Sequence, residues 1–267
     1  SSDFAIAMIA DRSIEKKDYP NDIKVTTNPM DIPNDSSISI VIELLGGVEL
    51  PYKIITESIK NKKHVITANK ALIAEHGDEI FRLARENNVY FGFEASVAGA
   101  IPIISTLMKN MANENIISIV GIINGTCNYI LDQMSSNNIS FNDALMSAKN
   151  LGYAEADPTF DINGMDAAHK ISILASLIYK VESPLKSTYV EGIEDITIMD
   201  INFAKELGYC IKHVGITNKY DNSIQCRVHP VLIHKDNILA QVLGVMNAVL
   251  ITGDKFGTSM LYGHGAG

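Results

Sequence analysis

Short apolar runs alternate with helical patterns in the first third of the chain. The runs with the length of strands are residues 4–10, 38–44, 64–67 and 89–93, and helical patterns lie at residues 52–61 and 78–86. Strands that alternate with helices are typical of a parallel, doubly wound sheet. We therefore predict an α/β fold in which residues 1–94 form a Rossmann-like nucleotide-binding domain.

The glycine turn that normally opens such a domain is not found in the sequence. In this fold a G-x-G-x-x-G turn follows the first strand and presents a helix N-terminus to the pyrophosphate. Here the chain enters an apolar strand almost directly after its first residues, and it stops at the glycine run 263–267. We expect that the first strand is missing, that the nucleotide-binding domain is partial and that the sequence is a fragment.

The pattern changes after residue 94. A strand is predicted at 116–123, helices at 128–134 and 140–150 with Ser140 as N-cap, and a helix at 171–178 that is apolar on nearly every face and should be buried. A further helix at 197–207 precedes strands at 210–217, 223–229 and 243–252. Strands gathered after a cluster of helices predict a mixed α+β domain at residues 95–262.

Composition and charge exclude several classes of protein. Residues 38–45 and 245–251, the longest apolar runs, are too short to span a bilayer. The net charge of −9 is spread along the chain without a basic stripe, so we expect no nucleic-acid partner. The three cysteines are widely separated and odd in number, which argues against disulfides and a zinc site. With no secretion leader visible, we expect a cytoplasmic protein.

The densest candidate chemistry lies at residues 151–170. This stretch holds Glu155, Asp157, Asp161, Asp166 and Lys170, directly before the buried helix. Asp166 and Lys170 are four residues apart, so they share one helical face. Burial and nearby carboxylates move the pKa of an amine in opposite directions, as proton-transfer groups require. An ordinary salt bridge at a helix end is the alternative.

Polar or small residues also follow the predicted strands of the first domain. Asp11 and Arg12 close the first, where an acid binds ribose hydroxyls and an arginine accepts a 2′-phosphate; the alternative is a plain polar strand end. Gly46 and Gly47 follow the second, and they either admit a ligand to the backbone or form a tight turn. Lys70 follows the third, and it either faces the ligand crevice or is solvated on a helix capped by Asn69.

Residues 151–158 (LGYAEADP) and 163–170 (NGMDAAHK) together resemble the homoserine dehydrogenases, in which an LGYxExDP segment and an NGxDxxxK segment form the substrate pocket. The resemblance implies that Lys170 is the proton donor and acceptor. It also implies that Glu155 and Asp166 hold the amino acid substrate, and that the backbone of Gly152 approaches the nicotinamide cofactor.

Shorter segments carry the same resemblance. The TANKA segment at residues 67–71 makes Lys70 a second catalytic candidate that faces substrate and cofactor, and the ELLGG segment at 43–47 places Gly46 against the cofactor. Residues 263–267 (GHGAG) resemble a loop that returns to the nucleotide-binding domain and brings Gly263 beside the nicotinamide. The resemblance alone implies a sodium ion held by carbonyls in the small-residue loop after the fourth strand, from Glu94, Val97, Gly99 and Ile101; a domain hinge is the alternative.

These observations predict a homoserine dehydrogenase that interconverts L-homoserine and L-aspartate 4-semialdehyde for threonine, methionine and isoleucine biosynthesis. The expected cofactor is NADP or NAD, with Arg12 favouring NADP. We expect residues 95–262 to provide catalysis and dimerisation in a homodimer or homotetramer, with no membrane partner. One alternative is another amino acid or aldehyde dehydrogenase. The other is a non-catalytic fragment that binds substrate or a partner but lacks the phosphate cradle.

Overall fold

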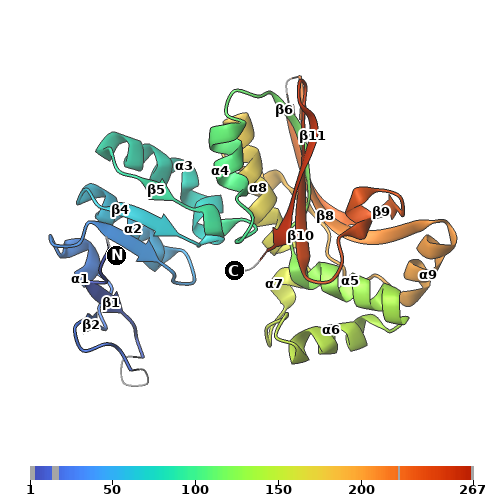
Figure 1. Ribbon diagram of the computed structural model, residues 1–267, viewed down its shortest axis with the longest axis horizontal. Coiled ribbons are helices and arrows are strands. Elements are labelled where there is room, and N and C mark those ends of the chain that lie inside the picture. The colour runs from blue at the N-terminus through green and yellow to red at the C-terminus, as the bar shows by residue number, and fades with distance from the viewer. Residues whose placement is uncertain (1–3, 14–17, 222, 266–267) are drawn as a thin grey trace. The chain divides into compact units, whose positions relative to one another are not determined.

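The chain divides into two compact units. The computed structural model describes residues 4–13, 18–221 and 223–265. The first unit ends at Phe93 and the second begins at Glu94 (Figure 1). Among the described residues, no helix has the length and apolar character needed to cross a membrane.

The first unit is an α/β domain whose strands are all parallel. Its elements are β1 (Met8–Ala10), β2 (Lys24–Thr26), α1 (Asp31–Asn34), β3 (Ile40–Glu43), α2 (Glu49–Lys60), β4 (His64–Thr67), α3 (Lys70–Asn87) and β5 (Phe91–Gly92). They form two ladders, β1-β2 and β3-β4-β5. A doubly wound sheet has the strand order 3-2-1-4-5-6. The orders of the two ladders, β2-β1 and β3-β4-β5, agree with the 3-2 and 4-5-6 parts of that order.

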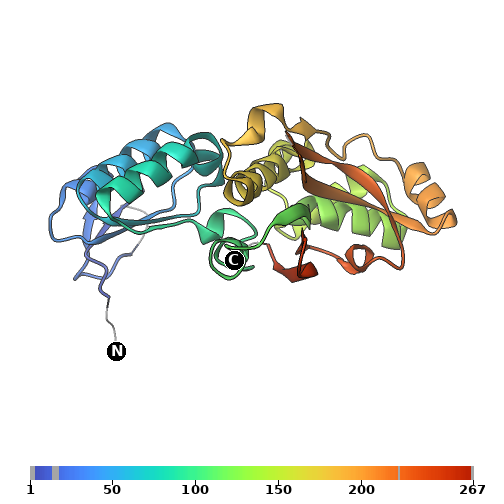
Figure 2. The ribbon, with the colours of Figure 1, turned by 90° about the horizontal axis from the view of Figure 1, so that it is seen from above.

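Apolar side chains from two helices and the sheet build the core of this unit. Helices α2 and α3 run side by side, and α2 also packs against β3 and β4 (Figure 2). The buried side chains are Val41, Ile54, Ile55, Ile59, Val65, Leu72, Ile80 and Ala84. The predicted parallel α/β fold is therefore confirmed.

Three elements of this unit differ from the prediction: α3 begins earlier, and β2 and α1 were not predicted. Helix α3 begins at Lys70, not at residue 78, because the Asn69 side chain accepts a hydrogen bond from the backbone N–H of Leu72 at 3.0 Å. Strand β2 and helix α1 were not predicted. Both are too short to give a periodic signal.

The second unit combines a six-stranded sheet with helices. Its elements include α4 (Ile103–Ser105), a π-helical turn η3 (Thr106–Asn110), β6 (Ile116–Ile122), α5 (Gly125–Asn137), α6 (Phe141–Asn150), α7 (Thr159–Ile162), α8 (Met165–Tyr179), β7 (Tyr189–Val190), α9 (Ile198–Glu206), β8 (Tyr209–Tyr220), β9 (Ser223–His234), β10 (Met246–Gly253) and β11 (Gly257–His264). The strand order is β11-β10-β6-β8-β9-β7. All neighbours are antiparallel except β7 and β9, which are parallel. The combination of this sheet with helices agrees with the predicted mixed α+β fold.

Helices α5 and α8 pack against the inner strands of the six-stranded sheet. Helix α8 packs against β8 and β9, whereas α5 packs against β8 and β10. The predicted N-cap of α6 is confirmed, since the Ser140 hydroxyl accepts the backbone N–H of Asp143 at 3.2 Å. Helix α8 buries Ile171, Ser172, Ile173, Leu174 and Ala175, as its apolar sequence predicted.

The last described strand corrects one expectation. Gly263 and His264 extend β11 and pair with β10, with Gly263 opposite Asn247, whereas a loop was expected from residue 263. The tight turn between Gly253 and Gly257 brings β11 back along β10 and sets this register. The rest of the expected loop, residues 266–267, lies outside the described residues.

Candidate functional site

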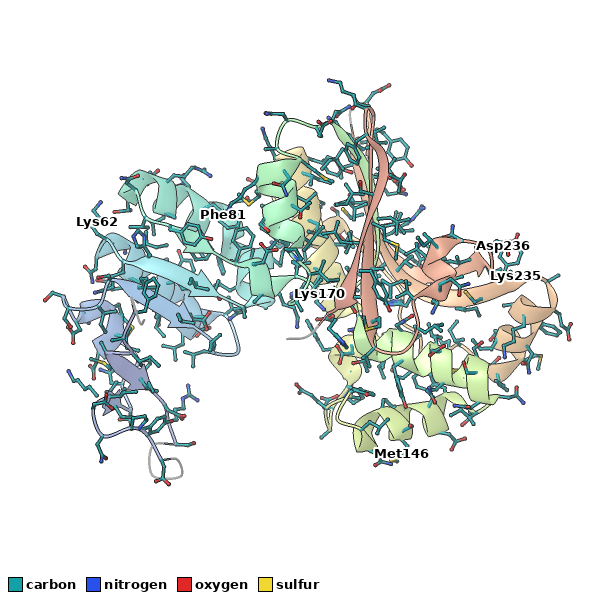
Figure 3. The ribbon with its side chains drawn as sticks, viewed as in Figure 1. Lys62, Phe81, Met146, Lys170, Lys235 and Asp236 are labelled. Atoms are coloured by element: carbon teal, nitrogen blue, oxygen red, sulfur yellow. The ribbon has the colours of Figure 1, made fainter. Side chains whose placement is uncertain are left out.

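Lys170 and Asp166 form a buried ion pair in the first turns of α8. The Lys170 ammonium donates to Asp166 Oδ2 and to the carbonyl oxygen of Ile123, both at 2.7 Å. Only 13% of the Lys170 side chain and 3% of the Asp166 side chain are exposed. Figure 3 labels Lys170 on this helix. The predicted i,i+4 contact is therefore present, and its burial distinguishes it from a surface salt bridge.

Asn124 joins this pair to a second carboxylate. Its Nδ2 donates to Asp166 Oδ2 and to Asp161 Oδ1, both at 2.8 Å. Its Oδ1 accepts the backbone N–H of Cys127 at 2.8 Å and so caps α5. Asn124 was not predicted as a site residue. An asparagine followed by glycine between a strand and a helix is the sequence signal that could have identified it.

Thr126 and Cys127, in the first turn of α5 after β6, form hydrogen bonds to backbone carbonyl oxygens. Thr126 donates to the carbonyl oxygen of Tyr153 at 2.7 Å, and the Cys127 thiol donates to the carbonyl oxygen of Asp161 at 3.2 Å. Burial raises the pKa of the Cys127 thiol, with a smaller contribution from Asp161. Burial and a raised pKa make the Cys127 thiol a poor nucleophile, so Lys170 and the neighbouring carboxylates are the stronger candidates for chemistry here.

The LGYAEADP segment forms an exposed loop after α6. Gly152 has a positive φ of 75°, and the Glu155 side chain is exposed. Asp157 stabilises the following turn, since its Oδ1 accepts from the Thr159 backbone N–H at 3.1 Å and hydroxyl at 2.6 Å. Among the described residues, the Glu155 side chain has no hydrogen-bond or ion-pair partner. Its carboxylate is available to a ligand.

Two histidines and one glycine lie around the start of α8. His169 is buried with its ring edge-on to Phe160, so it packs as a core residue. The Nε2 of His213 lies 2.9 Å from the carbonyl oxygen of Glu191, and burial lowers the pKa of His213. Gly164 has a φ of 88°, and a Cβ there would lie 3.2 Å from that same carbonyl oxygen. Glycine is therefore required at this position of the motif.

Buried polar contacts organise the strand ends of the first unit. The Glu43 carboxylate accepts from the Thr67 hydroxyl at 2.6 Å and from the Leu45 backbone N–H at 2.5 Å. Asn69 Nδ2 donates to the carbonyl oxygen of Gly47 at 2.8 Å. These contacts join the loop after β3 to the start of α3. Sequence reasoning assigned no role to Glu43, because its partners come from the next strand.

The residues expected to bind the cofactor in this unit lie at strand ends. Arg12 is exposed directly after β1, beside Asp11, whose carboxylate accepts from the Tyr19 hydroxyl at 2.6 Å. A Cβ on Gly46 would meet nothing within 4 Å, so the protein itself does not require glycine there. Lys70 is the first residue of α3 and is half-buried. In parallel sheets these carboxyl ends are where ligands bind.

The expected sodium ligands lie in the first residues of the second unit. The Glu94 carboxylate accepts the backbone N–H groups of Ile104 and Ser105, both at 2.8 Å. Its carbonyl oxygen accepts from the Val97 N–H at 3.4 Å, and the Ile101 carbonyl oxygen accepts from Ile103 at 2.7 Å. Within the described ranges, no three His, Cys, Asp or Glu side chains gather around one point.

Family models match both parts of the chain. Residues 1–94 match the model described as homoserine dehydrogenase, NAD binding domain, and residues 102–267 match the model described as homoserine dehydrogenase. The homoserine dehydrogenase of Pseudomonas aeruginosa is 45% identical over 98% of this chain and 60% of its own length. That of Helicobacter pylori is 47% identical over 96% of this chain and 60% of its own length.

Solved structures give the same result. A homoserine dehydrogenase from Thiobacillus denitrificans superposes with a TM-score of 0.92 at 45% identity, over 98% of this chain and 61% of that one. A hyperthermophilic archaeal homoserine dehydrogenase in complex with NADPH has a TM-score of 0.77 at 29% identity, over 90% of this chain and 70% of that one. The chain spans about 60% of the length of the curated relatives quoted.

Proposed function

Because the chain belongs to the homoserine dehydrogenase family, we propose that its protein interconverts L-homoserine and L-aspartate 4-semialdehyde with NAD(P). This reaction would serve threonine, methionine and isoleucine biosynthesis. One observation carries the proposal: a lysine ammonium lies between a buried carboxylate and a backbone carbonyl, both at 2.7 Å. A lysine held in this way is suited to exchange one proton with a substrate hydroxyl.

The proposed role of Lys170 is proton transfer. The nicotinamide cofactor supplies the hydride exchange. In the oxidation direction, neutral Lys170 accepts the proton of the homoserine hydroxyl. In the reduction direction, its ammonium donates that proton to the forming alkoxide. The contacts to Asp166 and Ile123 fix the position of Nζ for both directions.

Glu155 and Asp166 are proposed to hold the α-amino group of the substrate. Asp166 Oδ2 already accepts from Lys170 and Asn124. A carboxylate has about four lone-pair sites, so its other oxygen can accept from the substrate ammonium. The exposed Glu155 carboxylate adds a second charge-assisted contact.

The residues proposed to bind the cofactor are those that the family resemblance implies. Arg12, Gly46 and Lys70 contribute from residues 1–94, and Gly152 and Gly263 contribute through their backbones. The support is the position of the first three at carboxyl ends of strands, where the Glu43–Thr67–Asn69 contacts stabilise the loop that carries Gly46. The exposed guanidinium of Arg12 favours NADP, since its planar donors suit a 2′-phosphate. Lys70 is the second candidate for proton transfer.

A sodium ion is proposed to bind the carbonyl oxygens of Glu94, Val97, Gly99 and Ile101. Two of these carbonyls accept a backbone N–H, and each keeps a second lone pair for a cation. The positive φ of Ala98, 50°, bends the loop that carries them. Replacing sodium salts by tetramethylammonium salts should lower activity, and sodium should restore it. Equal activity in both would contradict a sodium site.

Homodimeric or homotetrameric assembly in the cytoplasm is also proposed, with residues 95–262 as the catalytic and dimerisation domain. The three free cysteines are consistent with a reducing compartment. Light scattering on the purified full-length protein, read against its monomer mass, tests the assembly.

An activity assay on the natural full-length protein tests the function. We expect NADPH consumption with aspartate semialdehyde and NADP reduction with homoserine. Glycerol and glyceraldehyde, which lack the amino acid group, should not react. A protein that binds homoserine without turnover would favour the non-catalytic alternative.

A further inference from the structure

In the part of the chain that the structure describes, the side-chain amide of Asn247 has no hydrogen-bond partner. Its Nδ2 and Oδ1 are both buried without a hydrogen bond among the described residues, and the residue is 1% exposed. An unpaired buried polar group is unfavourable, and native interiors seldom contain one. We propose that Asn247 recognises the carboxamide of the nicotinamide cofactor. Nδ2 would donate to the carboxamide oxygen, and Oδ1 would accept from its nitrogen.

The pairing register places this amide near the start of β10, beside the ends of β6 and β11. Asn247 is near the start of β10 and pairs with Gly263 of β11, and the adjacent Ala248 pairs with Ile122 of β6. A Cβ on Gly125 would lie 3.6 Å from Asn247 Oδ1, and a Cβ on Gly265 would overlap the amide. The amide is therefore held between two glycine backbones. Gly265 must move aside to admit a ligand.

The amide is close to the proposed proton-transfer group through the turn after β6. Lys170 donates to the carbonyl oxygen of Ile123, and a Cβ on Gly125, two residues further along the chain, would lie 3.6 Å from Asn247 Oδ1. Two residues span at most about 7 Å of backbone. A ring that reacts beside Lys170 would therefore have its substituent within reach of Asn247.

The pairing pattern and the local charge favour a primary carboxamide. Asn247 offers one donor and one acceptor side by side, and a carboxamide offers the complementary pair. A carboxylate or phosphate would leave Oδ1 without a donor. The Asp166 carboxylate pairs with the Lys170 ammonium, and Asn124 joins it to the Asp161 carboxylate, so a further anion in this region would meet two carboxylates.

Buried contacts from α5 hold the loop that precedes Asn247. Asn128 Nδ2 donates to the carbonyl oxygen of Gly244 at 2.8 Å, and Asp132 accepts the Gly244 backbone N–H at 2.9 Å. The buried Lys212 ammonium donates to the carbonyl oxygen of Val242 at 2.5 Å. The amide is thus presented from a fixed backbone, as recognition requires.

The inference rests on the proposed function, and its test separates the two. Dissociation constants of the full-length protein are measured by calorimetry for the natural cofactor and for its 3-acetylpyridine analogue, in which a ketone replaces the carboxamide. The ketone cannot donate to Oδ1. Wild-type protein should bind the natural cofactor about three- to tenfold more tightly, as expected for one lost hydrogen bond. Equal binding by the wild type would overturn the inference without any variant.

Two variants and a control complete the test. Asn247→Leu, or Asn247→Ala if the leucine variant does not fold, should bind both cofactors with equal affinity. Asn142→Leu, at an exposed position of α6, should behave as wild type. Retained discrimination in the Asn247 variants would overturn the inference. A raised KM for homoserine with retained discrimination would assign the amide to the amino acid instead. Failure of the wild type to bind either cofactor would contradict the proposed function itself.

Discussion

Asn124 donates its side-chain amide to Asp166 across 2.8 Å, and the carbonyl oxygen of the same side chain caps α5. One residue therefore sets the start of a helix and the orientation of the carboxylate that pairs with Lys170. Because Nδ2 and Oδ1 belong to one planar amide, the contact with Asp166 and the cap of α5 depend on a single side-chain orientation.

Asn124→Asp separates these two roles. Aspartate can still cap α5, so the free energy of unfolding should change less than in Asn124→Ala, which loses about 1 kcal/mol with the cap. The new carboxylate faces Asp161 and Asp166, so kcat should fall on the order of 10- to 100-fold through misplacement of the pair. Steady-state kinetics and urea unfolding measure both effects, with Asn142→Asp as the exposed control. Wild-type kcat in Asn124→Asp would show that Asn124 serves the fold only.

Lys170→Met should lose most turnover while keeping the affinity for NADPH, and it should lower the free energy of unfolding because the buried Asp166 carboxylate loses its cation. Loss of a general acid and base typically costs about 10²- to 10⁴-fold. Lys235→Met, at an exposed position labelled in Figure 3, is the matched control and should keep wild-type turnover. If Lys170→Met turns over normally, the proton passes elsewhere, and Lys70 becomes the first residue to test.

Asp166→Asn should destabilise the second unit, because it leaves the buried Lys170 ammonium without its anion. Removing one partner of a buried pair typically costs about 3–5 kcal/mol. The double variant with Lys170→Met should recover part of that loss, since no unpaired charge then remains. Urea unfolding of the two single variants and the double variant gives the coupling energy. Additive losses would mean that the two side chains are independent.

Glu155→Gln should raise the KM for homoserine more than the KM for the cofactor. The amide keeps the shape of the side chain but loses the charge that would pair with the substrate ammonium. Glu206→Gln, exposed at the end of α9, is the control. A proportional rise in both constants would assign Glu155 to support of the loop.

Tyr179 gives a dependence of stability on alkaline pH. Burial raises its pKa to about 12 from 10.0, and its hydroxyl donates to the carbonyl oxygen of Ile117 at 3.1 Å. Folding therefore favours the neutral phenol, so the contribution of this group is complete below pH 10 and is lost as pH rises toward 12. The difference in the free energy of unfolding between the wild type and Tyr179→Phe should shrink across that range. In an ultraviolet titration, Tyr179→Phe should lack one tyrosine that ionises near pH 12 in the wild type. A constant difference would contradict this.

Local signals predicted elements and near-neighbour contacts, whereas the buried polar contacts depend on strand pairing. The apolar run at His64–Thr67 gave β4 with its observed bounds, and the spacing of Asp166 and Lys170 gave their contact. Asn247 lies near the turn after β6 because β10 pairs with β6, and Glu43 contacts Thr67 because β3 pairs with β4. Register between distant strands has no local signal, so these residues required the structure.

The two ladders of the first unit have a consequence for the order of unfolding. The strands of the first unit are two to four residues long, and they form two separate ladders, β1-β2 and β3-β4-β5. In the second unit, β8 and β9 pair along their whole twelve-residue lengths. Amide hydrogens of the first unit should therefore exchange with solvent sooner than those of the β8–β9 hairpin. A ligand that binds only the folded first unit slows that opening in proportion to its concentration. If the first unit binds a dinucleotide as proposed, a higher dinucleotide concentration would delay its unfolding on heating, while the second unit stays folded.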